Sequence, residues 1–327
     1  MRQASPKSEQ LAAELMMVSP ETKIVGPAYG CRGYAGSLAE EEDIVALPGA
    51  GGFLIARAVE AGLRDLSSAY PMLSCRDWSQ LRADIDALAE PFVSATIVTD
   101  PFADIGLEAL VAEFDLVHPL HQHFVVDLDE SSLERISRHH RRKLRTGANS
   151  ADYRIQIAPP DETFLEHWLR LYQTLIERKR IQDMRAFSRS IFARQMALPG
   201  TIIASAWIGD ELLGADWYYM DSKNVYAHLS AYSESGYRRA VSYRLMEAAI
   251  RYFQPLSTRL TLGGAPVGQE QGGLAHFKAG WASYTLPTYI CGVVLREDEF
   301  LRLNGGIAPT AEGYFPRYRQ GEFGRGD

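Results

Sequence analysis

The sequence predicts a mixed α/β fold, because strand-like and helix-like hydrophobic patterns follow one another along the chain. Three strand-like apolar runs lie between residues 201 and 231, and short polar turns separate them. From about Ala240 the apolar residues recur every three or four positions, and Pro255 lies just past the last of them. A three-stranded meander followed by a helix that crosses the sheet accounts for both patterns.

The second half of the chain is expected to continue this alternation of strands and helices. A strand at 259–262 is expected to end at Gly263 and Gly264, because paired glycines break a strand. The expected elements are a strand at 153–157, a helix at 164–181, strands at 201–208, 212–220 and 224–231, a helix from 240, a strand at 259–262, a short helix at 273–279 and a strand at 283–294.

The first half is also predicted to be α/β. Its expected elements are a helix at 78–88, a strand at 93–98, a helix at 105–114, a strand at 124–128 and a helix that begins at Glu130. We place a domain boundary near 148–152, after this last helix, which gives domains at 1–150 and 151–327. The tail from Asn304 is rich in glycine and proline and is expected to be a loop, either a lid or a frayed end.

Composition narrows the class of protein. With 327 residues, of which 46% are hydrophobic, the chain has room for two globular domains with a substantial core. A formal net charge of −7 argues against a general nucleic-acid binder, although a local basic patch remains compatible with it. The three cysteines form no CxxC pair, so neither a disulfide framework nor a zinc knuckle is indicated. The apolar stretch 11–18 is short and contains Glu14, so no signal peptide or membrane span is expected and a cytoplasmic protein is predicted.

One segment concentrates basic side chains. The residues are Arg135, Arg138, His139, His140, Arg141, Arg142, Lys143 and Arg145, all within one predicted helix. Arg138, Arg142 and Arg145 fall on neighbouring turns, where together they could hold a pyrophosphate or an RNA backbone. The alternative is an ordinary solvated helix face.

The segment that leads into the helix at 240 is a second candidate anion site. Backbone N–H groups are free at the start of a helix, and a glycine there lets a diphosphate such as that of coenzyme A approach closely. The candidate contacts are Tyr232, Ser235, Gly236, Arg238 and Arg239. The pattern is degenerate, and an ordinary helix start would also explain it.

The hairpin at 212–231 suggests a catalytic pair. If its turn is centred on Ser222, Asp216 faces His228, and the carboxylate would orient the imidazole and raise its pKa. An imidazole backed by a carboxylate suits removal of a proton from an attacking amine. A polar pair with a structural role is the alternative.

Two further motifs carry weaker signals. His118, His121 and His123 have a spacing that metal sites use, but no further ligand is evident, so His123 is expected to contact substrate and no metal is predicted. The glycine-rich stretch 49–53 resembles a dinucleotide loop, yet Leu54 replaces its third glycine. A dinucleotide-dependent enzyme is therefore the least favoured alternative.

The sharpest local signature is a Gly263–Gly264 strand end followed by Phe277 and Lys278. This string resembles the end of the Fem-type aminoacyltransferases, a branch of the GNAT superfamily with tandem GNAT-like domains, and the segment 133–148 resembles the basic helix before their second domain. The resemblance covers about residues 93–295. It implies that Lys278 lies at the reaction centre, where its ammonium either stabilises a tetrahedral intermediate or contacts the phosphate or ribose of the donor. Phe277 and Gly264 are then candidate substrate contacts. The alternative for Lys278 is a surface lysine that closes a short helix.

These observations together predict an acyltransferase built from tandem GNAT-like domains. It would transfer an acyl or aminoacyl group from acyl-CoA or aminoacyl-tRNA to an amine or hydroxyl, such as that of a small molecule or of a glycan or peptide precursor. No tightly bound cofactor is expected, and tRNA is a possible partner. The alternative is a GNAT-like scaffold that binds a nucleotide-linked sugar or an RNA end without turnover. No motif sets the acceptor or the oligomeric state.

Overall fold

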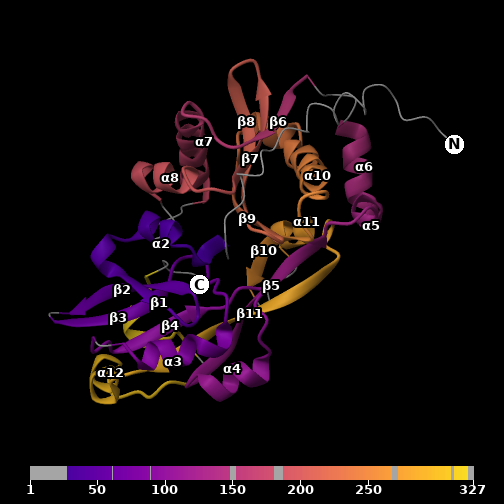
Figure 1. The fold of residues 1–327 in the computed structure, drawn as a ribbon. Helices are drawn as coiled ribbons and strands as arrows, with labels where there is room; N and C mark the ends of the chain where they lie inside the picture. Colours follow the sequence, from indigo (N-terminus) through magenta and orange to yellow (C-terminus); the bar gives the residue numbers. More distant parts are fainter. Residues whose placement is uncertain are drawn as a thin grey trace.

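The computed structural model describes residues 28–60, 62–88, 90–147, 152–179, 187–266, 272–310 and 313–322. They form one mixed sheet of eleven strands with helices on both faces (Figure 1). The sequence segment 11–18 and residues 148–151 of the expected boundary lie outside the described residues.

The two halves of the sheet repeat one order of elements. The first half contains β1 (Ile44–Leu47), β2 (Gly52–Glu60), β3 (Leu63–Ser68), a 3-10 turn (Trp78–Gln80), α3 (Leu81–Asp86), β4 (Ser94–Val98), α4 (Leu107–Glu113) and β5 (Leu116–Asp127). The second contains β7 (Thr201–Ile208), β8 (Glu211–Met220), β9 (Asn224–Tyr232), α9 (Glu234–Arg238), α10 (Val241–Phe253), β10 (Arg259–Pro266), α11 (Gly273–Ala279) and β11 (Tyr284–Val294). In each half an antiparallel meander is followed by a strand parallel to its third member, β4 beside β3 and β10 beside β9. The fold is thus a tandem α/β arrangement, although the sequence shows no repeat.

The halves meet through their last strands. β5 and β11 pair antiparallel in the middle of the sheet, whose order is β1-β2-β3-β4-β11-β5-β10-β9-β8-β7-β6, with β6 at Arg154–Ala158. β11 is the final strand along the chain, yet it lies between β4 and β5 of the first half. The sheet therefore continues across residue 150, and the division into two domains there stays a prediction.

Most of the expected elements are confirmed. The meander β7–β9 and the helices α10 and α11 lie where the hydrophobic pattern places them, and the helix expected at 164–181 is α7 (Phe164–Lys179). The expectation for β10 was wrong, because the strand continues through the two glycines. Gly263 adopts a φ of +79°, and the register with β5 shifts between Thr261 and Gly264, so a bulge replaces the expected strand end.

The basic segment is divided into two helices instead of the single helix expected. α5 (Ser132–Arg135) ends before Ile136, which is 3% exposed, and α6 (Arg138–Gly147) begins two residues later. Burial of Ile136 in the core beneath α10 turns the chain at this point. The exposed basic side chains are therefore carried mainly by α6.

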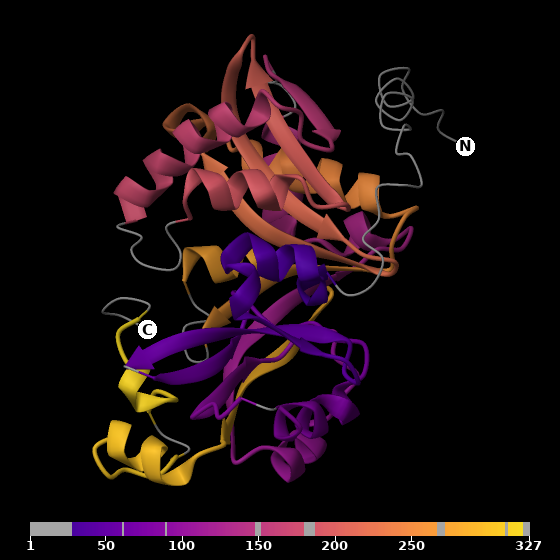
Figure 2. The ribbon, with the colours of Figure 1, turned by 60° about the vertical axis from the view of Figure 1, so that its left-hand side comes forward.

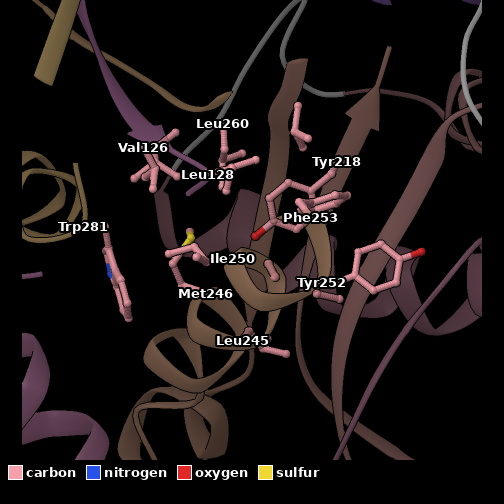
Figure 3. Packing of buried hydrophobic residues seen from close by; sticks show 14 of the residues in the cluster. Val126, Leu128, Tyr218, Leu245, Met246, Ile250, Tyr252, Phe253, Leu260 and Trp281 are labelled. Carbon is pink, nitrogen blue, oxygen red and sulfur yellow. The ribbon is translucent and has the colours of Figure 1, made fainter. Parts of the chain in front are cut away.

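Two apolar cores cover the opposite faces of the second half of the sheet. The first lies under α10 and includes Tyr218, Phe253 and Trp281 (Figure 3). The second lies under α7 and α8 (Arg189–Met196), where Trp168 and Trp217 are fully buried. Figure 1 shows α7 and α8 on one side of the strands and α10 on the other. The segment that carries α2 (Arg32–Leu38) lies between the halves (Figure 2) and contributes to the second core.

The described part of the C-terminal tail is packed on the first half. α12 (Glu297–Leu303), which the sequence analysis missed, is followed by a 3-10 turn at Arg317–Arg319. Arg319 Nε lies 2.9 Å from Asp65 Oδ2, and the Asp65 side chain is fully buried in β3. The phenyl ring of Phe315 fills the space that a side chain at position 292 would need. These contacts hold the described part of the tail against β2 and β3, so it is not a frayed end.

Candidate active site

The sheet loses its pairing at one place in the second half. β9 and β10 pair in parallel only from Asn224 to Tyr226, and within the described part of the sheet no later residue of β9 pairs with β10. On its other side β9 carries a bulge, because Trp217 pairs with Leu229 and Tyr218 pairs with Ala227. His228 is the extra residue. Within the residues that the structure describes, the edge of β9 that faces β10 therefore has backbone donors and acceptors without a strand partner beyond Tyr226.

Lys278 reaches the backbone at this place from α11. Its Nζ donates a hydrogen bond to the carbonyl oxygen of Gly264 at 3.0 Å, on the bulged part of β10. A methyl group on Gly263 would come within 3.2 Å of the same Nζ. Burial lowers the pKa of Lys278 to about 8. The structure thus brings together Lys278 and the Gly263–Gly264 pair, which the sequence analysis had joined only through a resemblance.

His123 lies on the other side of the two glycines. A side chain on Gly264 would collide with His121 and His123, so glycine is required for this close approach. His123 Nδ1 lies 3.2 Å from Thr261 Oγ1, and burial, with smaller contributions from His121 and Lys278, lowers its pKa to about 3. His123 is therefore a neutral imidazole next to the Lys278 site. Thr261 was missed because a threonine in a strand carries no local signal.

The expected pairing of Asp216 with His228 was wrong. The bulge shifts the register, so Asp216 faces Ser230 and the two side chains lie on opposite faces of the sheet. Asp216 accepts a hydrogen bond from Tyr232 under α10, and burial raises its pKa to about 6. The register derived from the sequence contained no bulge, so the separation of Asp216 from His228 could not be predicted.

His228 instead lies among aromatic rings on the α7 and α8 face. Its Nδ1 is 3.2 Å from the hydroxyl oxygen of Tyr29, and its Nε2 is 3.3 Å from Gln195 Oε1. The rings of Trp217 and Tyr219 pack against it. Burial lowers the pKa of His228 to about 3, which is opposite to the rise expected from a carboxylate partner. Tyr29 is 199 residues away along the chain, so no sequence spacing could reveal this contact.

The expected diphosphate loop is largely occupied by contacts within the protein. Gly236 N–H donates to Ser233 Oγ at 3.0 Å, and a side chain at Gly236 would overlap the carbonyl of Leu213 in β8. Arg238 forms an ion pair with Glu234, and Arg239 lies 3.4 Å from Asp152. The close approach that requires a glycine here is therefore to the neighbouring strand. The role of Ser235 in binding a donor stays a prediction.

The basic helix α6 exposes its cations near the Lys278 site. Arg138 and Arg142 are both exposed, and α6 packs against α10. Phe277, next to Lys278, packs its ring against Tyr243 of α10 with centroids 5.1 Å apart.

Other candidate sites can be assigned from the described residues. No group of three or more histidine, cysteine, aspartate or glutamate side chains within them could hold a metal ion. The glycine-rich stretch 49–53 lies in the turn between β1 and β2 and in the first two residues of β2, and Asp84 accepts from the N–H groups of Gly49 and Ala50. A dinucleotide loop joins a strand to a helix, so the dinucleotide-dependent alternative was wrong.

No helix among the described residues is long and apolar enough to cross a membrane.

Comparison with solved structures identifies the fold. FemX matches with a TM-score of 0.61 at 12% identity, over 93% of this chain and 99% of FemX. The C-terminal domain of a protein described as a lysylphosphatidylglycerol synthetase from Agrobacterium fabrum matches with a TM-score of 0.57 at 13% identity, over 92% of this chain and all of that domain. L-PGS from Bacillus licheniformis has a TM-score of 0.51 at 14% identity, over 83% and 93% of the two chains. No protein-family model and no curated protein sequence matches. The chain has a GNAT/Fem-like fold, as its sequence signature predicts.

The structural role of Gly236 can be measured. We expect Gly236→Ala to lower the free energy of unfolding by about 1–3 kcal/mol, because the new methyl group overlaps the Leu213 carbonyl. Gly273→Ala is the control, since nothing lies within 4 Å of its Cβ position. Urea denaturation measures both. If Gly236→Ala were as stable as wild type, the steric explanation would be wrong and a ligand-binding role for this glycine would be favoured.

The environment of Asp216 predicts a pH-dependent stability difference. A carboxyl whose pKa is raised to about 6 on folding favours the folded state when protonated, and this contribution is lost as the pH rises from about 4 through 6. We expect Asp216→Asn to match wild type near pH 4 and to be more stable by on the order of 2 kcal/mol at pH 7. Asp86→Asn, at an exposed ion pair, is the control. An Asn variant less stable than wild type at pH 7 would contradict the assignment.

Proposed function

We propose that this protein is an acyltransferase that moves an acyl or aminoacyl group to an amine or hydroxyl acceptor. The observation that carries the proposal is the position of the Lys278 ammonium at the bulged glycines, beside the place where β9 and β10 lose their pairing. Similarity of fold to FemX and to the lysylphosphatidylglycerol synthetase domain supports a transferase.

The chemistry needs one positive charge near the donor carbonyl. The acceptor nitrogen or oxygen forms a bond to the carbonyl carbon and loses a proton, and the tetrahedral intermediate that results carries an oxyanion. A preorganised ammonium stabilises that charge without solvent rearrangement. When the intermediate collapses, the bond to the leaving group breaks and the thiol or ribose hydroxyl takes up a proton. Lys278 therefore acts in its protonated form.

The distribution of charge favours aminoacyl-tRNA over acyl-CoA as the donor. The loop at 232–239 uses its glycine N–H and both arginines in contacts within the protein, and α6 carries a series of exposed cations that includes Arg138 and Arg142. An RNA backbone is a polyanion that a row of exposed cations can bind. Because charged tRNA is made in the cytoplasm, we also propose that the protein acts there on a small-molecule, glycan or peptide precursor.

Thermal stabilisation by candidate donors tests this proposal. A ligand at a hundredfold excess over its Kd stabilises the folded state by about 2.7 kcal/mol, which a melting curve detects. We expect stabilisation by charged tRNA, and we expect the double variant Arg138→Glu, Arg142→Glu to remove it. Stabilisation by acyl-CoA that the variant Arg239→Ala abolishes would identify coenzyme A as the donor carrier. Donor binding with no transfer to any acceptor would favour the non-catalytic scaffold.

The pH dependence of transfer tests the role of Lys278. Since the pKa of Lys278 is lowered to about 8, its ammonium is present below that pH and lost above it, so the wild-type rate should fall on the alkaline side of pH 8. Lys278→Arg keeps its charge to much higher pH, and its residual activity should lack this fall. We expect Lys278→Met to lose about 100-fold or more in kcat.

The matched control for these variants is Lys223→Met in the exposed turn between β8 and β9, which should behave as wild type. An unchanged kcat in Lys278→Met would remove Lys278 from the reaction centre.

A further inference from the structure

His140 differs from every other basic residue of α6, because its side chain is fully buried. Arg138, His139, Arg141 and Arg142 on the same helix are exposed. The imidazole of His140 has an exposed fraction of 0% and points away from the cationic face toward α11. A buried polar group must have hydrogen-bond partners on the protein, and their identity shows what the residue does.

Both ring nitrogens of His140 are hydrogen-bonded. Nε2 lies 2.9 Å from the carbonyl oxygen of Phe277, and Nδ1 lies 2.7 Å from Ser137 Oγ. Burial lowers the pKa of His140 to about 4, so the ring is neutral at physiological pH. A carbonyl oxygen only accepts, which places the single ring proton on Nε2. Nδ1 then accepts a hydrogen bond from the Ser137 hydroxyl.

The ring occupies a space formed by α11 and its neighbours. A side chain at Gly280 would overlap the imidazole, so glycine is needed at the end of α11. The rings of Tyr243 and Trp281 each lie with their centroids 5.0 Å from that of His140. Ser137 N–H also donates to the Gly280 carbonyl oxygen at 2.8 Å. The start of α6 is thereby joined to the last turn of α11 by two hydrogen bonds.

The carbonyl that His140 binds is one that the short helix leaves free. Carbonyl groups in the last turn of a helix have no partner within it, and Trp281 N–H, which could reach Phe277, donates to the Lys278 carbonyl instead. His140 supplies the missing donor. Phe277 is the residue before Lys278, so the hydrogen bond fixes the backbone from which the Lys278 side chain extends to Gly264.

We propose that His140 is a positioning residue that couples the basic helix to the reaction centre. It fixes the orientation of α11 and with it the place of the Lys278 ammonium. The inference rests on the proposed function only for its effect on turnover, because the position of Lys278 can be measured without any reaction. Binding of an anionic donor to the exposed face of α6 would then stabilise the arrangement of Lys278 through His140.

Substitutions at His140 separate positioning from packing. His140→Ala removes the donor to Phe277, and we expect kcat to fall about 100-fold, a loss typical of misplacement by about 1 Å, with a much smaller change in the KM for the donor. His140→Gln places an amide N–H within reach of the same carbonyl and should recover most of this loss. His167→Ala, a half-buried histidine on α7, is the control for loss of an imidazole elsewhere and should leave kcat unchanged.

A labelling experiment tests the position of Lys278 directly. Acetylation by a small amine-reactive ester, followed at residue 278 by mass spectrometry over pH 6 to 10, reports the pKa of the lysine. We expect His140→Ala to move the midpoint upward from about 8 as Lys278 becomes solvated, and His140→Gln and His167→Ala to leave it in place. His121 and His123, which face the lysine from β5, are present in all these proteins.

The outcomes distinguish this inference from the proposed function. If no donor supports transfer but the labelling midpoint shifts in His140→Ala alone, the positioning role holds and the transferase proposal fails. His140→Ala could instead lower the melting temperature and leave kcat and the labelling midpoint as in wild type, when both are measured well below that temperature. His140 would then only pack the core, and the inference would be overturned. Gly280→Ala should disturb both readouts, and His140→Ala should relieve its steric overlap in the double variant.

Discussion

The short parallel pairing of β9 with β10 is the constraint on which the rest of the structure depends. The two strands share only three paired positions before β9 bulges at His228 and β10 bulges at Gly263. A sheet that opens in its interior leaves backbone groups without partners, and these must be satisfied by solvent or by a ligand. β5 supports the far side of β10, so the opening does not break the sheet.

The elements around this opening are held by buried contacts of different kinds. On one side Lys278 is fixed by a carbonyl of the bulge, and α11 that carries it is fixed by His140. On the other side the neutral imidazole of His228 and several aromatic rings fill the space under α7 and α8. Burial, and not ion pairing, sets the protonation of Lys278, His123 and His228. A partly buried cation beside the unpaired edge of a strand suits a reaction that develops a single negative charge.

Apolar runs and hydrophobic periodicity were sufficient to predict the β7–β9 meander and α10, because β7 and β8 are buried along almost their whole length and α10 buries one continuous face. The same patterns did not reveal α8 or α9. The same reasoning missed β1 and β3, where the exposed and buried residues do not alternate clearly, and it also missed β2, whose burial does alternate. It missed the bulges as well, because a bulge adds one residue and reverses the faces beyond it. The Gly263–Gly264 and Phe277–Lys278 signature correctly placed one part of the site. Partners far apart in sequence, such as Tyr29 with His228 and His140 with Phe277, follow only from the folded chain.

Hydrogen exchange of the backbone tests the central claim most directly, namely that the reaction centre lies where β9 and β10 lose their pairing. Within residues 227–232, the N–H groups that face β10 have no partner in the described part of that strand and should exchange rapidly in the free protein, whereas those bonded to β8 should be protected. A saturating donor identified by its thermal stabilisation should slow exchange there and in α11, and should leave β1 to β3 unchanged. Protection confined to the first half of the sheet, with no change in β9, would contradict the account.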